Sequence, residues 1–136
     1  MTKEEINMEV VRRAIQALND RDVEGFLSSF TEDGTSHEVF FPEPLNLEEF
    51  RPFLEEWLNA YPDAKIDTQN MVAEGDKVAV ENVVSGTFKN DLSGNKATGK
   101  SYQAREGVFF DLSDGKIKAE RIYLDQKHIE EQLGIS

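Results

Sequence analysis

The sequence predicts an α+β fold, in which helices pack on one face of a curved antiparallel sheet. Apolar residues recur at helical spacing in the first half of the 136 residues, whereas the second half alternates at strand spacing between short turns. Helices that precede a run of strands favour this class over a parallel, doubly wound sheet. The length is that of one ordinary domain, so we expect a single domain over residues 1–136.

Two helical patterns open the chain. The first starts at the capping-box pair Thr2 and Glu5 and continues as an apolar stripe from Ile6 to Leu18. A shorter pattern follows Asp22, a residue type that is favoured at the N-cap. Its apolar stripe consists of Val23, Phe26, Leu27 and Phe30. We therefore expect a long helix followed by a short one.

A short strand is expected in "SHEVFF", residues 36–41, before a loop and a third helix. Asn46 and Glu49 form the cap pair of that helix. Pro52 lies early in the helical pattern, and proline is tolerated in a first turn but not deep inside a helix. The helix is therefore expected to start late or to bend, and to end before Pro62.

Four strands are expected in the second half, at residues 64–75, 76–88, 100–112 and 115–125. The sequence "SDGK" between the last two predicts a tight hairpin, because Asp-Gly suits a turn with positive φ. Consecutive strands with short connections pair antiparallel. The tail "QKHIEEQLG" is expected to form a short helix or an ordered arm.

Residues 94–101, "GNKATGKS", match the pattern of a nucleotide-binding P-loop. A working P-loop connects a buried strand to a helix whose N-terminal N–H groups hold the phosphates. Here a polar loop precedes Gly94, and a strand pattern follows Ser101. We therefore interpret the match as a coincidence and expect Lys100 and Ser101 at the mouth of a hairpin.

The composition excludes several classes of protein. The chain has 27 acidic and 15 basic residues, for a net charge of −12, which opposes binding to nucleic acid and to anionic membranes. No apolar run is long enough to span a bilayer and no secretory leader opens the chain, so a cytoplasmic location is expected. There is no cysteine, and the two histidines lie far apart, so we expect no metal site.

Several segments resemble the SnoaL-like polyketide cyclase family, a branch of the nuclear-transport-factor-2-like superfamily. In order, they are "FTEDGTSHEV", "EGDKVAV", "TGK", and "DGKI" with the later Y-x-D and "QLG". The resemblance covers nearly the whole chain. It implies a cone-shaped, cystatin-like α+β domain whose N-terminal helices pack on the concave face of the sheet and enclose a blind apolar pocket. It also implies a homodimer formed through the outer face of the sheet.

Asp125 is the first candidate for catalysis. Strand alternation divides this segment into two faces, one with Arg121, Tyr123 and Asp125 and the other with Glu120, Ile122 and Leu124. In the cyclases that the chain resembles, the Asp of the Y-x-D motif serves as an acid, a base or a water-orienting group. Burial in an apolar pocket would raise its pKa and suit it to proton transfer. The alternative is an N-cap for the tail helix.

Further candidates for the pocket are Tyr123, Asn82, Gln103 and Arg105. Asn82 interrupts an apolar face, where it contacts either a ligand or the backbone. Arg105 inside a pocket would need an anionic partner such as Asp125. The alternative is that Arg105 faces outward and Glu106 inward, since one step of register exchanges the faces.

His37 and Trp57 complete the set of candidates. His37 lies where the family often has a pocket-side histidine or aromatic residue, and it could act as a base or as a hydrogen-bond donor. The alternative for His37 is a structural histidine with its hydrogen bonds satisfied. Trp57 belongs to the apolar stripe of the third helix, so it is first a core residue and could also line the pocket.

Two chemistries of the superfamily are not expected. Limonene epoxide hydrolases place an Arg and an Asp two residues apart on the strand where this chain has Asn82 and Val84. Ketosteroid isomerases carry an oxyanion-binding acid on the strand before the last hairpin, where counting back from "DGKI" gives Gly107.

The resemblance leaves an enzyme of the cyclase or isomerase type as the preferred function. It would act without a cofactor, by acid–base chemistry on a small, mostly apolar carbonyl compound. The alternatives are a non-catalytic domain that binds a small apolar molecule, and a dimerisation module. Members of the superfamily range from enzymes to binding proteins, so the fold alone does not decide between them.

Overall fold

The computed structural model describes residues 1–135, which form one six-stranded sheet and four helices. The helices are α1 (Lys3–Asn19), α2 (Val23–Leu27), α3 (Leu47–Ala60) and α4 (Gln126–Leu133). The strands are β1 (Phe30–Glu38), β2 (Leu45–Asn46), β3 (Lys65–Glu74), β4 (Lys77–Thr87), β5 (Ser101–Ser113) and β6 (Lys116–Leu124). Among these residues, no helix has both the length and the apolar character needed to cross a membrane.

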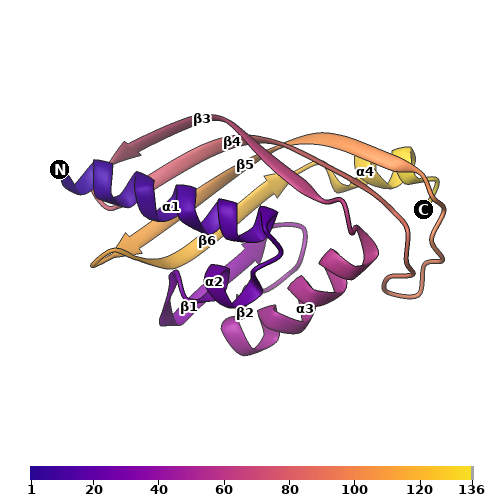
Figure 1. Ribbon diagram of the computed structural model, residues 1–136, viewed down its shortest axis with the longest axis horizontal. Helices are drawn as coiled ribbons and strands as arrows, with labels where there is room; N and C mark the ends of the chain where they lie inside the picture. The colour runs from indigo at the N-terminus through magenta and orange to yellow at the C-terminus, as the bar shows by residue number, and fades with distance from the viewer. Residues whose placement is uncertain (136) are drawn as a thin grey trace.

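The strands follow the order β2-β1-β6-β5-β4-β3 in an open, curved sheet (Figure 1). Strands β3 to β6 form an antiparallel meander, as the short connections predict. Strand β1 lies parallel to β6, so the sheet is mixed rather than wholly antiparallel. The chain passes through α3 and four strands, β2 to β5, before β6 returns parallel to β1. The predicted α+β fold is confirmed.

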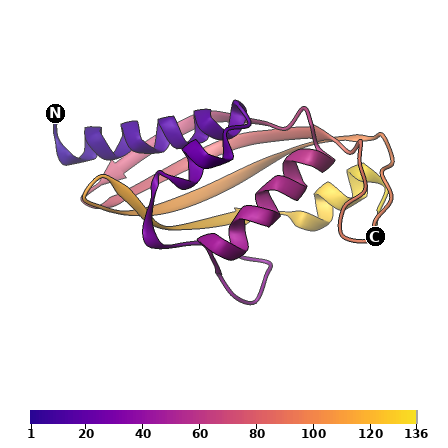
Figure 2. The same ribbon diagram turned by 60° about the horizontal axis from the view of Figure 1, so that its bottom comes forward.

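Helices α1, α2 and α3 lie along one face of the sheet, while α4 lies at the end where the connection between β4 and β5 turns back (Figures 1 and 2). The capping boxes predicted at Thr2 and Asn46 are both present, and each side chain accepts a hydrogen bond from the backbone N–H three residues on. Helix α3 begins directly after Asn46 and contains Pro52, so the expected late start is wrong. The second helix ends at Leu27, and Phe30 opens β1 instead.

Residues 94–101 do not have the geometry of a phosphate site. They lie in the loop between β4 and β5, and Ser101 begins a strand rather than a helix. Gly99 has a φ of 74°, and its N–H donates to the Phe88 carbonyl oxygen over 2.9 Å, which closes the mouth of the loop. The interpretation of the P-loop match as a coincidence is confirmed.

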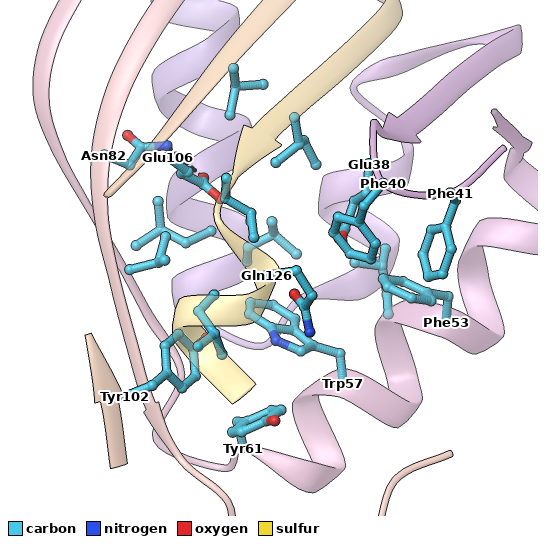
Figure 3. Close-up of a pocket in the computed structure, with 18 of the residues that line it drawn as sticks. Glu38, Phe40, Phe41, Phe53, Trp57, Tyr61, Asn82, Tyr102, Glu106 and Gln126 are labelled. Carbon is cyan, nitrogen blue, oxygen red and sulfur yellow. Dashed lines mark hydrogen bonds between the residues drawn. The ribbon is translucent and has the colours of Figure 1, made fainter. Parts of the chain in front are cut away.

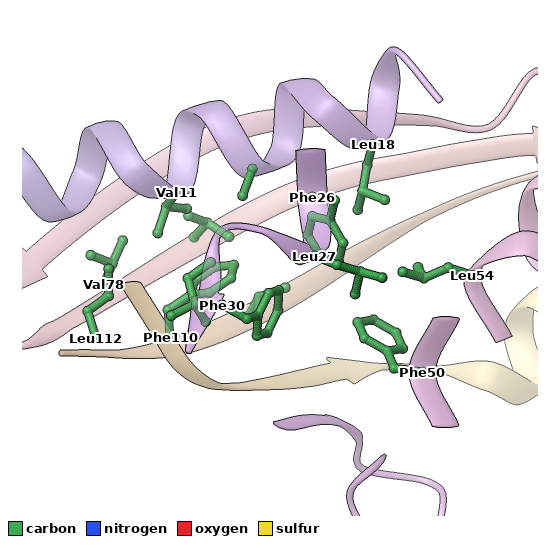
Figure 4. Close-up of a cluster of buried hydrophobic side chains, with 14 residues drawn as sticks. Val11, Leu18, Phe26, Leu27, Phe30, Phe50, Leu54, Val78, Phe110 and Leu112 are labelled. Carbon is green, nitrogen blue, oxygen red and sulfur yellow. The ribbon is translucent and has the colours of Figure 1, made fainter. Parts of the chain in front are cut away.

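Two apolar clusters fill the space between the helices and the sheet. The larger lies under α1 and α2, where the rings of Phe26, Phe30 and Phe50 meet edge to face with centroids 5.2 to 6.3 Å apart (Figure 4). The smaller lies around α4 and includes Tyr61, Phe88, Tyr102, Ile129 and Leu133. Because both clusters contribute to the walls of one cavity, the interior is not filled completely between them.

Candidate functional site

A cavity of about 450 Å³ opens between the helices and the concave face of the sheet (Figure 3). Its volume lies within the range of small-molecule sites. Side chains from all four helices and from strands β1, β3, β4, β5 and β6 line it, and most of them are apolar or aromatic. The polar exceptions include three glutamates from three adjacent strands: Glu38, Glu106 and Glu120.

Strand pairing brings these three carboxyl groups together. Glu38 ends β1, Glu120 lies on β6 beside it, and Glu106 lies on β5 on the other side of β6. Alternation turns Glu120 inward with Ile122 and Leu124, all of which line the cavity. A mostly apolar cavity with three acids from neighbouring strands is therefore the distinctive feature of the site.

Glu120 is the most deeply buried of the three, with 4% of its surface exposed. The hydroxyl of Ser36 donates a hydrogen bond of 2.7 Å to its Oε1 atom. Burial raises the pKa of Glu120 to about 8, and the charges of Glu106 and Glu38 act in the same direction, whereas the Ser36 bond opposes them. At neutral pH this carboxyl group therefore holds its proton in most molecules.

Glu38 and Glu106 have raised pKa values for the same main reason. Burial, followed by the charge of Glu106, raises the pKa of Glu38 to about 7. Burial also raises the pKa of Glu106, against the hydrogen bond of 2.9 Å that Asn82 Nδ2 donates to its Oε2 atom. Asn82 is itself oriented by Thr68, whose hydroxyl donates to Asn82 Oδ1 over 2.8 Å. Thr68, Asn82 and Glu106 thus form a hydrogen-bonded chain across β3, β4 and β5.

Aromatic rings form the remainder of the walls. Phe53 and Trp57 project from α3, and the ring of Phe41 meets Phe53 edge to face with centroids 6.0 Å apart (Figure 3). In this view Glu38 lies near Phe41 and Phe53, whereas Glu106 lies on the opposite side. Tyr61 and Tyr102 lie in the lower part of the same view, 5.4 Å apart and nearly perpendicular. Rings of this kind present large apolar surfaces, so the site suits a ligand with a flat or apolar body.

The sequence profile of the SnoaL-like polyketide cyclases matches residues 8–133. The chain belongs to the SnoaL-like polyketide cyclase family. A search of curated proteins finds no match.

Solved structures agree with this assignment. A candidate polyketide cyclase from Xanthomonas campestris aligns over 97% of this chain and 99% of its own, with 24% identity and a TM-score of 0.89. One from Pseudomonas putida shares 26% identity over 93% of this chain and 97% of its own, with a TM-score of 0.79. A candidate hydroxylase from Streptomyces galilaeus, AclR, shares 20% identity over 94% and 95%, with a TM-score of 0.84. Proteins that share this fold are therefore described with more than one type of chemical activity.

The expected placement of Asp125 in the pocket of the SnoaL-like domain is wrong. Asp125 is exposed, and its carboxylate accepts a hydrogen bond of 3.1 Å from the N–H of His128. It is the N-cap of α4, which was the alternative interpretation. The side chain that precedes it on the inner face of the sheet is Leu124.

Tyr123, Gln103 and Arg105 do not line the cavity either; all three are exposed, because they lie on the outer face of the sheet. Tyr123 is 46% exposed and meets Phe109 edge to face at 6.0 Å. Arg105 lies 4.0 Å from Glu81 on the neighbouring strand. The alternative in which Arg105 faces outward and Glu106 inward is therefore the observed arrangement.

Asn82 and Trp57 do line the cavity, whereas His37 does not. Asn82 is 1% exposed, and both ends of its amide are hydrogen-bonded to side chains. His37 is partly buried, and its Nε2 atom lies 2.9 Å from the Phe41 carbonyl oxygen, which is the structural role given as its alternative.

Sequence reasoning missed Glu38 and Glu120 as site residues. The available signal was a charged residue on the inner face of each of two strands. Glu120 shares a face with the apolar residues Ile122 and Leu124, and Glu38 follows buried Ser36 at strand spacing. Within residues 1–135 no group of three or more His, Cys, Asp or Glu side chains has the geometry to hold a metal ion.

Proposed function

We propose that this protein is an enzyme that works without a cofactor and performs acid–base chemistry on a small, mostly apolar carbonyl compound. The observation that carries the proposal is the group of three buried glutamates with raised pKa values in an apolar cavity. Carboxyl groups in such surroundings titrate near neutral pH, where they exchange protons with a bound compound most effectively. Family membership supports the same class of reaction.

The three acids take different roles because their environments differ. Glu38 has a pKa of about 7 and no side-chain hydrogen bond to any residue described by the structure, so about half of it is ionised at neutral pH and free to act as a base. Glu120 has a pKa of about 8 and acts as the proton-bearing partner. Glu106, held by Asn82, completes the polar edge of the cavity.

The proposed step is proton removal next to a carbonyl group. Glu38 takes the proton from the carbon, the electrons of the broken C–H bond move toward the carbonyl oxygen, and Glu120 donates a hydrogen bond to the resulting enolate. Stabilising that oxygen in a dry cavity lowers the barrier more than the same contact would in water. The enolate then either takes a proton at another carbon, as in an isomerisation, or attacks a second carbonyl, as in a cyclisation.

The experiment is α-proton exchange in D₂O, followed by NMR with 2-tetralone, a bicyclic ketone with acidic α-protons. We expect the protein to accelerate exchange over buffer and the Glu38→Gln variant to lose the acceleration by at least about a hundredfold, a typical contribution of a general base. Glu81→Gln removes an exposed acid from the outer face of β4 and serves as the matched control. Equal exchange by the wild-type protein and by Glu38→Gln would reject the catalytic proposal.

The same experiment distinguishes an enzyme from a protein that binds the compound without catalysis. In that case 2-tetralone would quench the fluorescence of Trp57, the single tryptophan of the chain, in a saturable way but without exchange.

The homodimer stays a prediction. Its interface would include the exposed outer-face residues Phe109 and Tyr123, and sedimentation velocity at micromolar concentration would test it.

A further inference from the structure

The side chains that line the cavity include several acidic residues but, among the described residues, no basic one. Its ionisable lining residues are Glu38, Glu106, Glu120, Glu130, Tyr61 and Tyr102. Within residues 1–135, no lysine, arginine or histidine side chain lines the cavity. Arg105 and Arg121, on strands β5 and β6, bind acids on the outer face instead. The charge inside the cavity is therefore unbalanced whenever its glutamates ionise.

The carboxylate oxygens are also incompletely paired. Among the described residues, Glu120 accepts one hydrogen bond, from Ser36 to Oε1, and its Oε2 atom has no partner, although the side chain is 4% exposed. Glu106 accepts one bond, at Oε2, and neither oxygen of Glu38 has a protein partner within residues 1–135. No side-chain oxygen of the described residues is both fully enclosed and without a partner, so these unpaired oxygens are open to the cavity. A ligand that supplies positive charge can reach each of them there.

The aromatic walls favour the same kind of ligand. The cavity contains the rings of Trp57, Tyr61 and Tyr102 together with those of Phe40, Phe41 and Phe53. The faces of such rings carry negative electrostatic potential, and they attract ammonium groups, most strongly where water is excluded. The net charge of −12 attracts cations toward the molecule as well.

We propose that the natural ligand of this cavity carries a cationic nitrogen, held between the paired strands' carboxylates and the aromatic side chains of α3. The inference rests on the proposed function for the site but concerns its ligand class: a mostly apolar amine rather than a neutral or anionic compound. An acidic ligand is disfavoured because it would add negative charge to a site that already holds four glutamates.

Two probe molecules of the same shape separate the effect of ligand charge on affinity from the effect of ligand size. Phenyltrimethylammonium and tert-butylbenzene differ in one central atom, nitrogen or carbon, and thus in charge but little in size. Quenching of Trp57 reports binding of either, because this is the only tryptophan of the chain and it lines the cavity. Neither probe has a carbonyl group, so the result does not depend on catalysis.

The measured quantity is the ratio of the two dissociation constants at pH 6 and at pH 9. Glu38 and Glu120 lose their protons across this interval, since their pKa values are about 7 and about 8. We expect the preference for the ammonium probe to rise by at least about tenfold in the wild-type protein, the effect of one desolvated cation contact. The double variant Glu38→Gln, Glu120→Gln should show a much smaller rise, since Glu106 is the remaining acid of the three, and should bind tert-butylbenzene as the wild-type protein does.

The control is the double variant Glu56→Gln, Glu81→Gln, which removes two exposed acids and therefore has the same net charge. It should retain the rise, because long-range attraction is screened by salt. A ratio that is constant with pH in the wild-type protein, or a rise that is undiminished without Glu38 and Glu120, would overturn the ligand class. The exchange of 2-tetralone would be unaffected by that outcome, so failure of this inference is distinguishable from failure of the proposed enzyme.

Discussion

Replacement of Glu120 by glutamine tests the electrostatics of the site without any ligand. The substitution keeps the size of the side chain and leaves an amide oxygen that can still accept the hydrogen bond from Ser36. It removes only the group that titrates. Any change in how stability depends on pH therefore reports the cost of an ionised carboxyl group at this position.

The magnitude follows from the pKa of the folded state. Because Glu120 titrates at about 8 when folded and at 4.5 when unperturbed, its protonated form stabilises the fold fully below pH 4.5. Between pH 4.5 and pH 8 the unfolded chain loses this proton while the folded chain keeps it, so the free energy of unfolding falls as pH rises. Over this whole pH interval the free energy of unfolding falls by about 5 kcal/mol at most, at about 1.4 kcal/mol per pH unit.

The assay is urea unfolding at pH 5, 6, 7 and 8.5 at constant ionic strength. At pH 5 we expect Glu120→Gln to match the wild-type protein within about 1 kcal/mol, the value of one hydrogen bond. At pH 8.5 the variant should be more stable than the wild-type protein by several kcal/mol. This difference is on the order of the free energy of unfolding that the wild-type protein loses over that pH interval. Glu56→Gln, on the exposed side of α3, should follow the wild-type curve. Parallel curves for Glu120→Gln and the wild-type protein would refute the reasoning.

Three further predictions follow from other contacts. Asp125→Asn should keep both thermal stability and α-proton exchange, since asparagine also caps helices, whereas Asp125→Ala should lose about 1 kcal/mol on thermal unfolding with exchange intact. Asn82→Ala should cost about 1 to 3 kcal/mol in urea unfolding, because Thr68 and Glu106 both lose a buried partner. The pH profile of kcat/KM should be bell-shaped with limbs near 7 and 8, since the proposed mechanism needs Glu38 ionised and Glu120 protonated; a monotonic profile would contradict these roles.

Most of the fold could be predicted because local signals and tertiary structure agree. The pair Thr2 and Glu5 caps α1 as its spacing indicates, and the hairpin after Ser113 has positive φ at Asp114 and Gly115. The pairing of β1 with β6 could not be predicted in this way. It joins segments about eighty residues apart, and no turn sequence specifies such a contact.

The site was harder to predict because alternation defines two faces of a strand without saying which one is buried. On β5 the choice lay between Arg105 and Glu106, whereas on β1 only His37 was considered and its neighbour Glu38 was missed. In each case the residue with the better-known chemistry lies outside the cavity, and a glutamate lies inside. Burial of a glutamate is rare enough to be discounted from sequence alone, yet here it marks the site.

A feature of strand β6 explains why Tyr123 and Asp125 were both predicted on the wrong face of the sheet. Ile117 is fully buried, so strict alternation from it would turn residues 119, 121, 123 and 125 inward. The pairing with β5 instead steps from Ile117 opposite Leu112 to Ala119 opposite Asp111, which leaves Lys118 as an extra residue. This β-bulge shifts the phase by one, and it turns Glu120 rather than Tyr123 toward the cavity. The most deeply buried acid of the cavity thus owes its position to one unpaired lysine on the solvent side of the strand. The bulge depends on the partner strand and has no signature in β6 itself.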